Sequence, residues 1–287
     1  MAPSRRHFLA ATAAATLEAS AQTRAGAPRA RTGPVLCLDS RLLPQIDYSP
    51  FGTMLNALGF DGCDLAVEPG GLVSPEQSPV DMVRAIEVIT GEGLEVPVVT
   101  TAFQSINEPW ARNVLALCAR SGVVYFRTAY SKYPDRLISR RNDIGGLVSY
   151  ARAARIGLAL PYPDAESLLS GLDPAWAGYD FDTAEGDIRA ALPRIRTIVL
   201  HDSRKDGDHV VACKLGEGTV DWNALFSTLA HARFSGPLTI APNYPAPDKL
   251  DAIRRDLDFA RKQLNTAYQK ELSLFDSTHE TNRRADQ

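Results

Sequence analysis

The sequence predicts a single-domain α/β protein with a (β/α)8 barrel, and three observations point to it. From residue 34 onward, short β-branched runs alternate with longer helical patterns. Eight such pairs spread over about 250 residues, which is the number and the length typical of this fold. No linker divides them, so we expect one domain over residues 34–268. The alternative is a doubly wound open sheet, but it requires a glycine-rich phosphate loop after the first strand, where DSRLLPQ stands instead.

The strands are predicted from β-branched and apolar runs that end at turn residues. In chain order they are VLCLDS (35–40), GCDLAV (62–67), LEVPVVTT (94–101), VVYFRTA (123–129), IGLALP (156–161), GYDFD (178–182), TIVLH (197–201) and LTIAP (238–242). Most are apolar almost throughout, as expected of parallel strands that are covered on both faces.

The connecting helices are predicted from apolar residues that recur every three or four positions. In the segment 80–90, one face collects Met82, Val83, Ile86 and Ile89. Similar patterns cover residues 50–58, 110–119, 143–154 and 221–232, and residues 248–268 form a last amphipathic helix.

The two ends of the chain have sequence patterns that differ from those of the barrel segment. Residues 1–33 resemble a twin-arginine export signal with a flexible lead-in, because SRRHFL (4–9) precedes an alanine-rich run and ASA (19–21) suits a signal peptidase. A disordered basic leader is the alternative, since Glu18 interrupts the apolar run. We therefore expect a periplasmic or secreted protein, with residues 269–287 as a polar C-terminal tail.

The charge distribution and the cysteines argue against several classes of partner and of metal site. The formal net charge is −3 and both signs are dispersed, so the sequence shows neither a basic stripe for nucleic acid nor one for a membrane surface. No apolar run is long enough to span a bilayer. The four cysteines lack metal-binding spacing and are expected to be mostly buried thiols, with a bridge between Cys37 and Cys63 as the alternative.

The candidate functional residues lie at the carboxyl ends of the predicted strands, where (β/α)8 barrels hold their active sites. This rule gathers around one rim Asp39, Glu68, Thr101, Arg127, Pro161, Tyr162, Asp182, His201, Asp202 and Asn243. Metal-assisted sugar chemistry requires oxygen and imidazole ligands from several strands, and a base that moves a proton between adjacent carbons.

Asp182 and His201 end neighbouring strands and are candidate ligands for a shared divalent ion. Two other interpretations stay open. Asp182 is also a suitable cap for the helix that DTAEG begins, and His201 is also compatible with a rim histidine that is only hydrogen-bonded.

Glu68 is a candidate acid or base, and its alternative is a carboxylate on the turn made by VEPGG. Arg127 is a candidate ligand for an anionic or polyhydroxy substrate, because its planar group binds paired oxygens. Its alternative is a salt bridge to a neighbouring rim acid. KLGEG (214–218) leads into a helix that Thr219 or Asp221 would cap, and its backbone amides could hold an anion.

Six longer segments carry a family resemblance. They are GFDGCDLAVEPGG (59–71), GLEVPVVTTA (93–102), VVYFRTAYSKY (123–133), GLDPAWAGYDFDTAEG (171–186), KLGEGTVDW (214–222) and GPLTIAPNYP (236–245). These segments are similar, in order, to blocks of the sugar phosphate isomerase/epimerase family, the xylose-isomerase-like TIM barrels. The resemblance covers nearly all of residues 34–268.

The resemblance implies a divalent metal (manganese, magnesium, cobalt or zinc) held by a glutamate, an aspartate, a histidine and a glutamate that follow strands five to eight. The aspartate matches Asp182, and the histidine matches His201 loosely. Strand five ends at Pro161 without an acid, and Asn243 stands where the last glutamate is usual. Because the two glutamates also transfer the proton in ketose epimerases, the sequence predicts an incomplete metal site.

These observations lead to two functional hypotheses. The first is an exported sugar isomerase, epimerase or sugar-derivative lyase, and the second is a non-catalytic sugar- or partner-binding barrel; an oligomer is compatible with both. The superfamily also contains apurinic endonucleases, which the acidic charge and the missing ligands disfavour. The predicted roles are catalysis for Glu68 and His201, substrate binding for Arg127, Tyr162, Asp202 and Asn243, and metal binding for Asp182 and His201.

Overall fold

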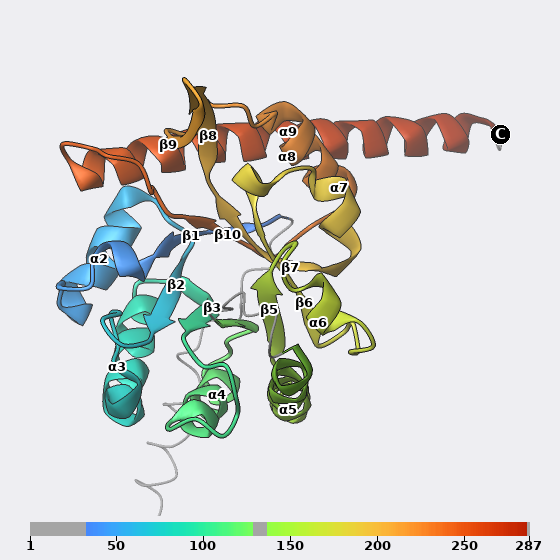
Figure 1. The fold of residues 1–287 in the computed structure, drawn as a ribbon. Helices are drawn as coiled ribbons and strands as arrows, with labels where there is room; N and C mark the ends of the chain where they lie inside the picture. The colour runs from blue at the N-terminus through green and yellow to red at the C-terminus, as the bar shows by residue number, and fades with distance from the viewer. Residues whose placement is uncertain (1–32, 129–136, 286–287) are drawn as a thin grey trace, which may run out of the picture. The chain divides into compact units, whose positions relative to one another are not determined.

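The computed structural model describes residues 33–128 and 137–285. In this part of the chain, eight parallel strands form a closed barrel in the order β1-β10-β7-β6-β5-β4-β3-β2 (Figure 1). The strands are β1 (Val35–Asp39), β2 (Gly62–Val67), β3 (Glu95–Thr101), β4 (Tyr125–Thr128), β5 (Gly157–Pro161), β6 (Ala177–Asp182), β7 (Ile195–Leu200) and β10 (Pro237–Ile240). The predicted single-domain (β/α)8 barrel is therefore confirmed.

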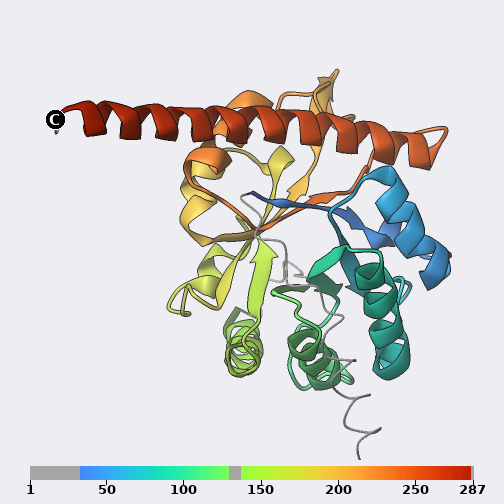
Figure 2. The ribbon, with the colours of Figure 1, turned by 180° about the vertical axis from the view of Figure 1, so that it is seen from behind.

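Helices follow the strands and lie outside the barrel (Figures 1 and 2). They are α2 (Tyr48–Leu58), α3 (Ser78–Gly91), α4 (Ala111–Arg120), α5 (Leu137–Ala154), α6 (Glu166–Leu169), α7 (Ile188–Ala191), α8 (Trp222–His231) and α9 (Lys249–Ala285). Asp221 caps α8 by accepting from the backbone N–H of Ala224 at 3.0 Å, as one of the two predicted caps. In the described segments, no helix combines the length and the apolar character needed to cross a bilayer.

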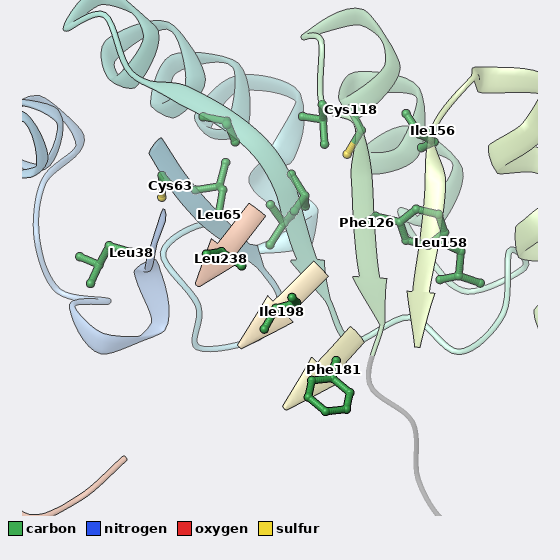
Figure 3. Close-up of a cluster of buried hydrophobic side chains, with 14 of the residues drawn as sticks. Leu38, Cys63, Leu65, Cys118, Phe126, Ile156, Leu158, Phe181, Ile198 and Leu238 are labelled. Carbon is green, nitrogen blue, oxygen red and sulfur yellow. The ribbon is translucent and has the colours of Figure 1, made fainter. Parts of the chain in front are cut away.

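Strand side chains that point away from the barrel axis pack against the helices. Successive residues of a strand face opposite sides, so every second residue contributes. We call this set the outer layer; its fully buried members include Leu38, Leu65, Phe126, Leu158, Phe181, Ile198 and Leu238 (Figure 3). Burial of each such side chain contributes about 1.5–3 kcal/mol, so the outer layer is a main source of stability.

Several side chains that point into the middle of the barrel are polar. We call them the lumen network, which consists of Asp64, Thr100, Arg127, Asp180, Thr197 and Thr239. Arg127 of β4 donates to Thr239 of β10 at 2.5 Å, and because these strands are not neighbours the bond crosses the inside of the barrel. Barrel interiors are usually filled by bulky branched apolar residues, so the lumen network is a departure from the usual filling.

An antiparallel hairpin follows β7 and was not predicted. It consists of β8 (Asp202–Asp206) and β9 (His209–Cys213), which pair from Asp202 with Cys213 to Asp206 with His209. Its turn contains Gly207 with φ of 61°, a left-handed conformation that glycine adopts without strain. The Asp-Gly pair in KDGD was the available hairpin signal.

The last helix is longer than expected. α9 continues to Ala285, whereas the sequence predicts a helix that ends at residue 268 and a polar tail after it. The segment is polar, but it is also rich in good helix formers such as lysine, glutamate, leucine and arginine, and it contains no proline. Helix propensity therefore explains the difference.

Cys37 and Cys63 are both free and buried. Leu38 is the register partner of Cys63, and Cys37 is the partner of Gly62. Because neighbouring positions on a strand face opposite sides, Cys63 lies with Leu38 in the outer layer while Cys37 faces the lumen. The two thiols therefore point to opposite faces of the sheet, which excludes the alternative of a bridge in this fold.

Candidate functional site

The Arg127 guanidinium is the centre of the lumen network. Its Nη2 is ion-paired with Oδ2 of Asp64, and its Nε lies 3.5 Å from Oδ1 of Asp180. Only 4% of Arg127 is exposed. Burial lowers the pKa of this guanidinium, but the charges of Asp180 and Asp64 outweigh burial and raise it. Arg127 is therefore a permanent cation fixed inside the barrel.

Two threonines hold the Asp64 carboxylate against Arg127. Thr100 Oγ1 donates to Oδ1 at 2.7 Å, and Thr239 Oγ1 donates to Oδ2 at 3.1 Å. Burial raises the pKa of Asp64 to about 6, while the charge of Arg127 opposes that rise. A buried charge that loses its partner is strongly destabilising, so the acid and the guanidinium depend on each other.

A cavity of about 260 Å³ opens at the carboxyl ends of the strands, next to Arg127. It lies where (β/α)8 barrels place their active sites, and its size is near the lower end of small-molecule pockets. The lining residues are Arg41, Arg127, Pro161, Tyr162, Asp164, Asp180, Asp182, Glu185, Val199 and His201. Charged hydrogen-bonding groups dominate this lining.

Asp182 has two partners. Its Oδ1 accepts from the backbone N–H of Ala184 at 3.0 Å and caps the 3-10 helix η4 (Thr183–Glu185), while its Oδ2 lies 2.7 Å from Nδ1 of His201. The sequence left open that Asp182 caps a helix and that His201 is a hydrogen-bonded histidine of the rim. The structure contains both arrangements, because Asp182 caps η4 and also contacts His201 at the mouth of the barrel.

Both ring nitrogens of His201 are hydrogen-bonded. Nε2 lies 2.8 Å from the carbonyl oxygen of Ala241, which only accepts, so Nε2 carries a hydrogen. Nδ1 faces the Asp182 carboxylate, which accepts as well, and the arrangement is that of a protonated imidazole. Burial lowers the pKa of His201, but the hydrogen bond and charge of Asp182 and the bond to Ala241 together raise it.

These donors do not fit a divalent metal. A histidine that ligates a metal must offer a lone pair, and neither nitrogen of His201 has one to offer in this arrangement. β5 ends in Pro161, and Asn243 is exposed beyond β10. Among the described residues, no three histidine, cysteine, aspartate or glutamate side chains converge as a metal-binding group. A hard cation requires several anionic oxygens that converge on one point, and the described carboxylates that line this mouth do not converge in that way.

Four of the predicted site residues meet in the cavity, namely Arg127, Tyr162, Asp182 and His201. Their chemical roles stay predictions. Glu68 is half-buried on the turn after β2, outside the residues that line the cavity, and Asn243 is outside them as well. The structure therefore places Glu68 and Asn243 outside the cavity that the other four predicted residues line.

Asp202 lies in a different environment, because its carboxylate is enclosed by protein donors and only 1% of the residue is exposed. The donors are the backbone N–H groups of Gly216 (3.0 Å), Gly218 (3.1 Å) and Val220 (3.2 Å) and the indole of Trp222 (2.9 Å), which we call the anion cradle. The loop predicted to hold an anion therefore holds one, the carboxylate of Asp202. In this geometry Asp202 supports the loop, and its predicted substrate contact stays a prediction.

Five charged residues of the site were not predicted as such, namely Arg41, Asp64, Asp164, Asp180 and Glu185. Asp180 precedes Asp182 by two positions on one strand, so the alternation of strand side chains could have placed both on the same face. Asp64 sits inside an apolar strand, where a carboxylate needs a partner. Arg41 is paired with Asp39 at 2.7 Å, and nothing in its local sequence marks it as a cavity residue.

A second hollow, of about 310 Å³, lies on the outer surface between α3, α4 and α5. Arg112 lies over the Tyr150 ring there, 5.7 Å from its centroid. The residues that line this hollow include no carboxylate, histidine or cysteine. We therefore place the candidate site at the mouth of the barrel.

The comparisons with known proteins agree on the fold. No protein-family model and no curated protein matches the sequence. Among solved structures, an L-ribulose 3-epimerase has a TM-score of 0.63 at 15% identity, covering 84% of this chain and 98% of its own. A xylose isomerase-like TIM barrel protein from Mycobacterium smegmatis in complex with magnesium has a TM-score of 0.63 at 13% identity, with 82% and 97% covered.

A third neighbour is D-allulose 3-epimerase from Methylomonas sp. in complex with D-allulose. Its TM-score is 0.60 at 16% identity, with 80% of this chain and 97% of that chain covered. At such low identity the likeness establishes the architecture, and the chain has the fold of the xylose-isomerase-like TIM barrels.

Proposed function

We propose that this chain is sugar isomerase/epimerase-like and binds a small sugar or sugar derivative at the mouth of its barrel without a divalent metal. One observation carries the proposal: a single cavity collects Arg127, Tyr162, Asp182 and His201 while both nitrogens of His201 are already hydrogen-bonded. The cavity supplies groups that bind a polyol, and the hydrogen bonds withdraw the imidazole from metal ligation.

The chemistry of the cavity supports a polyhydroxy ligand. Arg41 and Arg127 are donors, Asp180 and Asp182 are acceptors, and Tyr162 adds a half-buried ring. A sugar hydroxyl both donates and accepts, so it can be matched by such closely spaced groups. One structural neighbour contains D-allulose, and this likeness enters the proposal as a fold-level analogy.

Catalysis of an isomerase, epimerase or lyase reaction is the second candidate function. Asp180 and Asp182 are carboxylates in the cavity, which is the group that such proton transfers use. Both are engaged by protein partners, Asp180 by Arg127 and Asp182 by His201. A non-catalytic binding barrel accounts for the same residues without requiring a free base.

One set of measurements on the full chain tests the proposal. Protein treated with a chelator is titrated calorimetrically with a broad panel of monosaccharides, and each mixture is analysed for new products by chromatography, before and after addition of Mn²⁺. We expect binding without metal. Binding that appears only with Mn²⁺ contradicts the metal-free site, and the absence of any binding contradicts the sugar assignment. New products without metal would assign the protein to the enzymes.

Two matched variants locate the site. Arg41→Gln removes a cation from the mouth, and Arg112→Gln removes one from the outer hollow. We expect the first to weaken sugar binding and the second to leave it unchanged. Equal effects would contradict the placement of the ligand in the barrel.

Export through the twin-arginine route is a separate part of the proposal. It rests on SRRHFL, the alanine-rich run and ASA, which lie outside the residues that the structure describes. The test is fractionation of cells that produce the full chain and its Arg5→Lys/Arg6→Lys variant. We expect only the unaltered chain outside the cytoplasm, and retention of both in the cytoplasm contradicts export.

A further inference from the structure

We infer that the mouth selects by charge: it binds amine-bearing and uncharged sugars and rejects sugars that carry a phosphate or a carboxylate. This inference rests on the proposed function and adds the class of ligand to it. Three features of the described residues lead to it, namely the pairing of every cation at the mouth, the excess of carboxylates, and an anion cradle that is already filled.

In the part of the chain that the structure describes, each cation that lines the cavity already has a carboxylate partner. Arg41 Nη2 lies 2.7 Å from Asp39, and its Nε donates to both oxygens of the same carboxylate at 3.0 and 2.9 Å. Arg127 is paired with Asp64 and lies 3.5 Å from Asp180. An incoming phosphate or carboxylate would compete with these acids at short range, and like charges repel strongly where water is excluded.

His201 is also paired with a carboxylate. Its Nδ1 lies 2.7 Å from Asp182, so the pair carries no net positive charge. Among the described residues, the lining therefore contains three cationic groups against four carboxylates, or six carboxylates once the partners Asp39 and Asp64 are included. A cleft lined by an excess of one charge attracts ligands of the opposite charge, which here are cations.

The backbone site that could have received a phosphate is occupied by the protein itself. In (β/α)8 barrels, phosphate groups are frequently bound by the loops after strands seven and eight. In this chain the loop after the seventh barrel strand, β7, forms the anion cradle around Asp202. A Cβ placed on Gly218 would overlap this carboxylate, so the cradle has no room for a second anion.

Asp180, which lines the cavity, offers a specific contact for an uncharged group. Its Oδ1 accepts from Thr197 at 2.5 Å and lies 3.5 Å from Nε of Arg127, which is buried and makes no hydrogen bond. A hydroxyl of a ligand in the cavity can donate to this carboxylate. A phosphate or carboxylate oxygen accepts only, and would leave two anions facing each other.

The test is calorimetric titration with matched sugars in three stereochemical series, gluco, galacto and manno. Each series contains the neutral hexose, the 2-amino sugar, the uronate and the 6-phosphate. We expect the amino sugar and the neutral hexose of at least one series to bind, and the two anionic analogues to bind at least about tenfold more weakly, or 1.4 kcal/mol. Added salt should weaken only the amino sugar, because salt screens charge attraction.

The outcomes separate this inference from the proposed function. An anionic sugar that binds as tightly as its neutral counterpart overturns the charge selection and leaves the sugar-binding proposal intact. If no member of any series binds, the proposed function fails and the inference with it. Glu185→Gln removes one carboxylate from the lining and should reduce the preference for the amine; an unchanged preference also contradicts the inference.

A second experiment tests the anion cradle. Asp202→Gly empties it, and we expect a lower Tm that formate or inorganic phosphate raises more than chloride does at equal ionic strength. Asp202→Asn, which keeps the shape and removes the charge, should show a smaller loss and no such rescue. If folded Asp202→Gly is not rescued by either anion, the cradle is not an anion site and the third feature fails.

Discussion

The outer layer and the lumen network are two faces of the same eight strands, and they are built from opposite chemistry. Phe126 and Arg127 are adjacent in β4, yet one packs among helices while the other holds two acids inside the barrel. The outer layer tolerates any apolar residue of suitable volume, because its contacts are non-directional. In the lumen network each residue is specified by its partner. The difference teaches that the same strands carry interchangeable apolar contacts on one face and partner-specific charged contacts on the other, next to the proposed ligand site.

The largest expected effect comes from breaking the lumen network at its cation. Arg127→Met leaves Asp64 buried without its guanidinium, which should lower the free energy of unfolding by about 3–5 kcal/mol. The double variant Arg127→Met/Asp64→Asn should recover much of that loss. Urea unfolding followed by circular dichroism gives both values. Equal losses for the single and double variants would show that the two residues are not coupled.

The second-largest effect is expected from a substitution on the opposite face of the strands, in the outer layer. Leu158→Ala deletes a fully buried side chain of the outer layer and should cost about 2–5 kcal/mol. Because Leu158 faces away from the cavity, the sugar affinity of the folded variant should be unchanged. Calorimetric titration of this variant beside Arg41→Gln sharpens the comparison. A loss of affinity in Leu158→Ala would show that the two faces are not independent.

A smaller effect on the free energy of unfolding is expected at a buried acid that lies outside the lumen network. Asp256 on α9 is 2% exposed, and burial raises its pKa to about 6. Between about pH 4 and pH 6 the folded chain keeps a proton that the unfolded chain has lost, so the contribution of Asp256 to the unfolding free energy falls as pH rises.

Asp256→Asn removes that dependence. Relative to the unaltered chain, this variant should gain about 2–3 kcal/mol of unfolding free energy between pH 4 and pH 7. Urea unfolding at unit intervals of pH measures the difference, in which the other acids cancel. Parallel pH curves for the two proteins would contradict a raised pKa at Asp256.

The smallest effect removes one hydroxyl from the lumen network. Thr239→Val keeps the shape and loses the bonds to Arg127 and Asp64, which should cost about 1–3 kcal/mol. Ile240→Val, one position along on the outer layer, should cost about 0.5–1.5 kcal/mol. Thermal unfolding of both variants supplies the comparison. A larger loss in Ile240→Val would reverse the ranking of the two faces.

The fold could be predicted because the outer layer leaves a local signal. The alternation of β-branched runs and helical patterns reports which segments must cover each other, and strand positions were placed within a few residues. The hairpin β8–β9 was not predicted because its strand Asp202–Asp206 is polar and mostly exposed, so hydrophobic patterning does not indicate a strand there.

The lumen network could not be predicted, because its partners are far apart in sequence. Arg127 and Asp64 are separated by 63 positions, and Thr239 and Asp64 by 175. Barrel closure alone brings them together. The sequence did identify Arg127 as either a substrate ligand or a salt-bridge partner, and the salt bridge is confirmed while the ligand role stays a prediction.

The most direct test of a metal-free mouth is calorimetric titration of Mn²⁺ into chelator-treated protein, with Asp182→Ala as the matched control. The closed Asp182–His201–Ala241 arrangement predicts no saturable binding in either protein up to about millimolar metal, which corresponds to a free energy weaker than about −4 kcal/mol. One equivalent of Mn²⁺ bound at micromolar concentration by the unaltered chain, and lost in Asp182→Ala, would contradict the account.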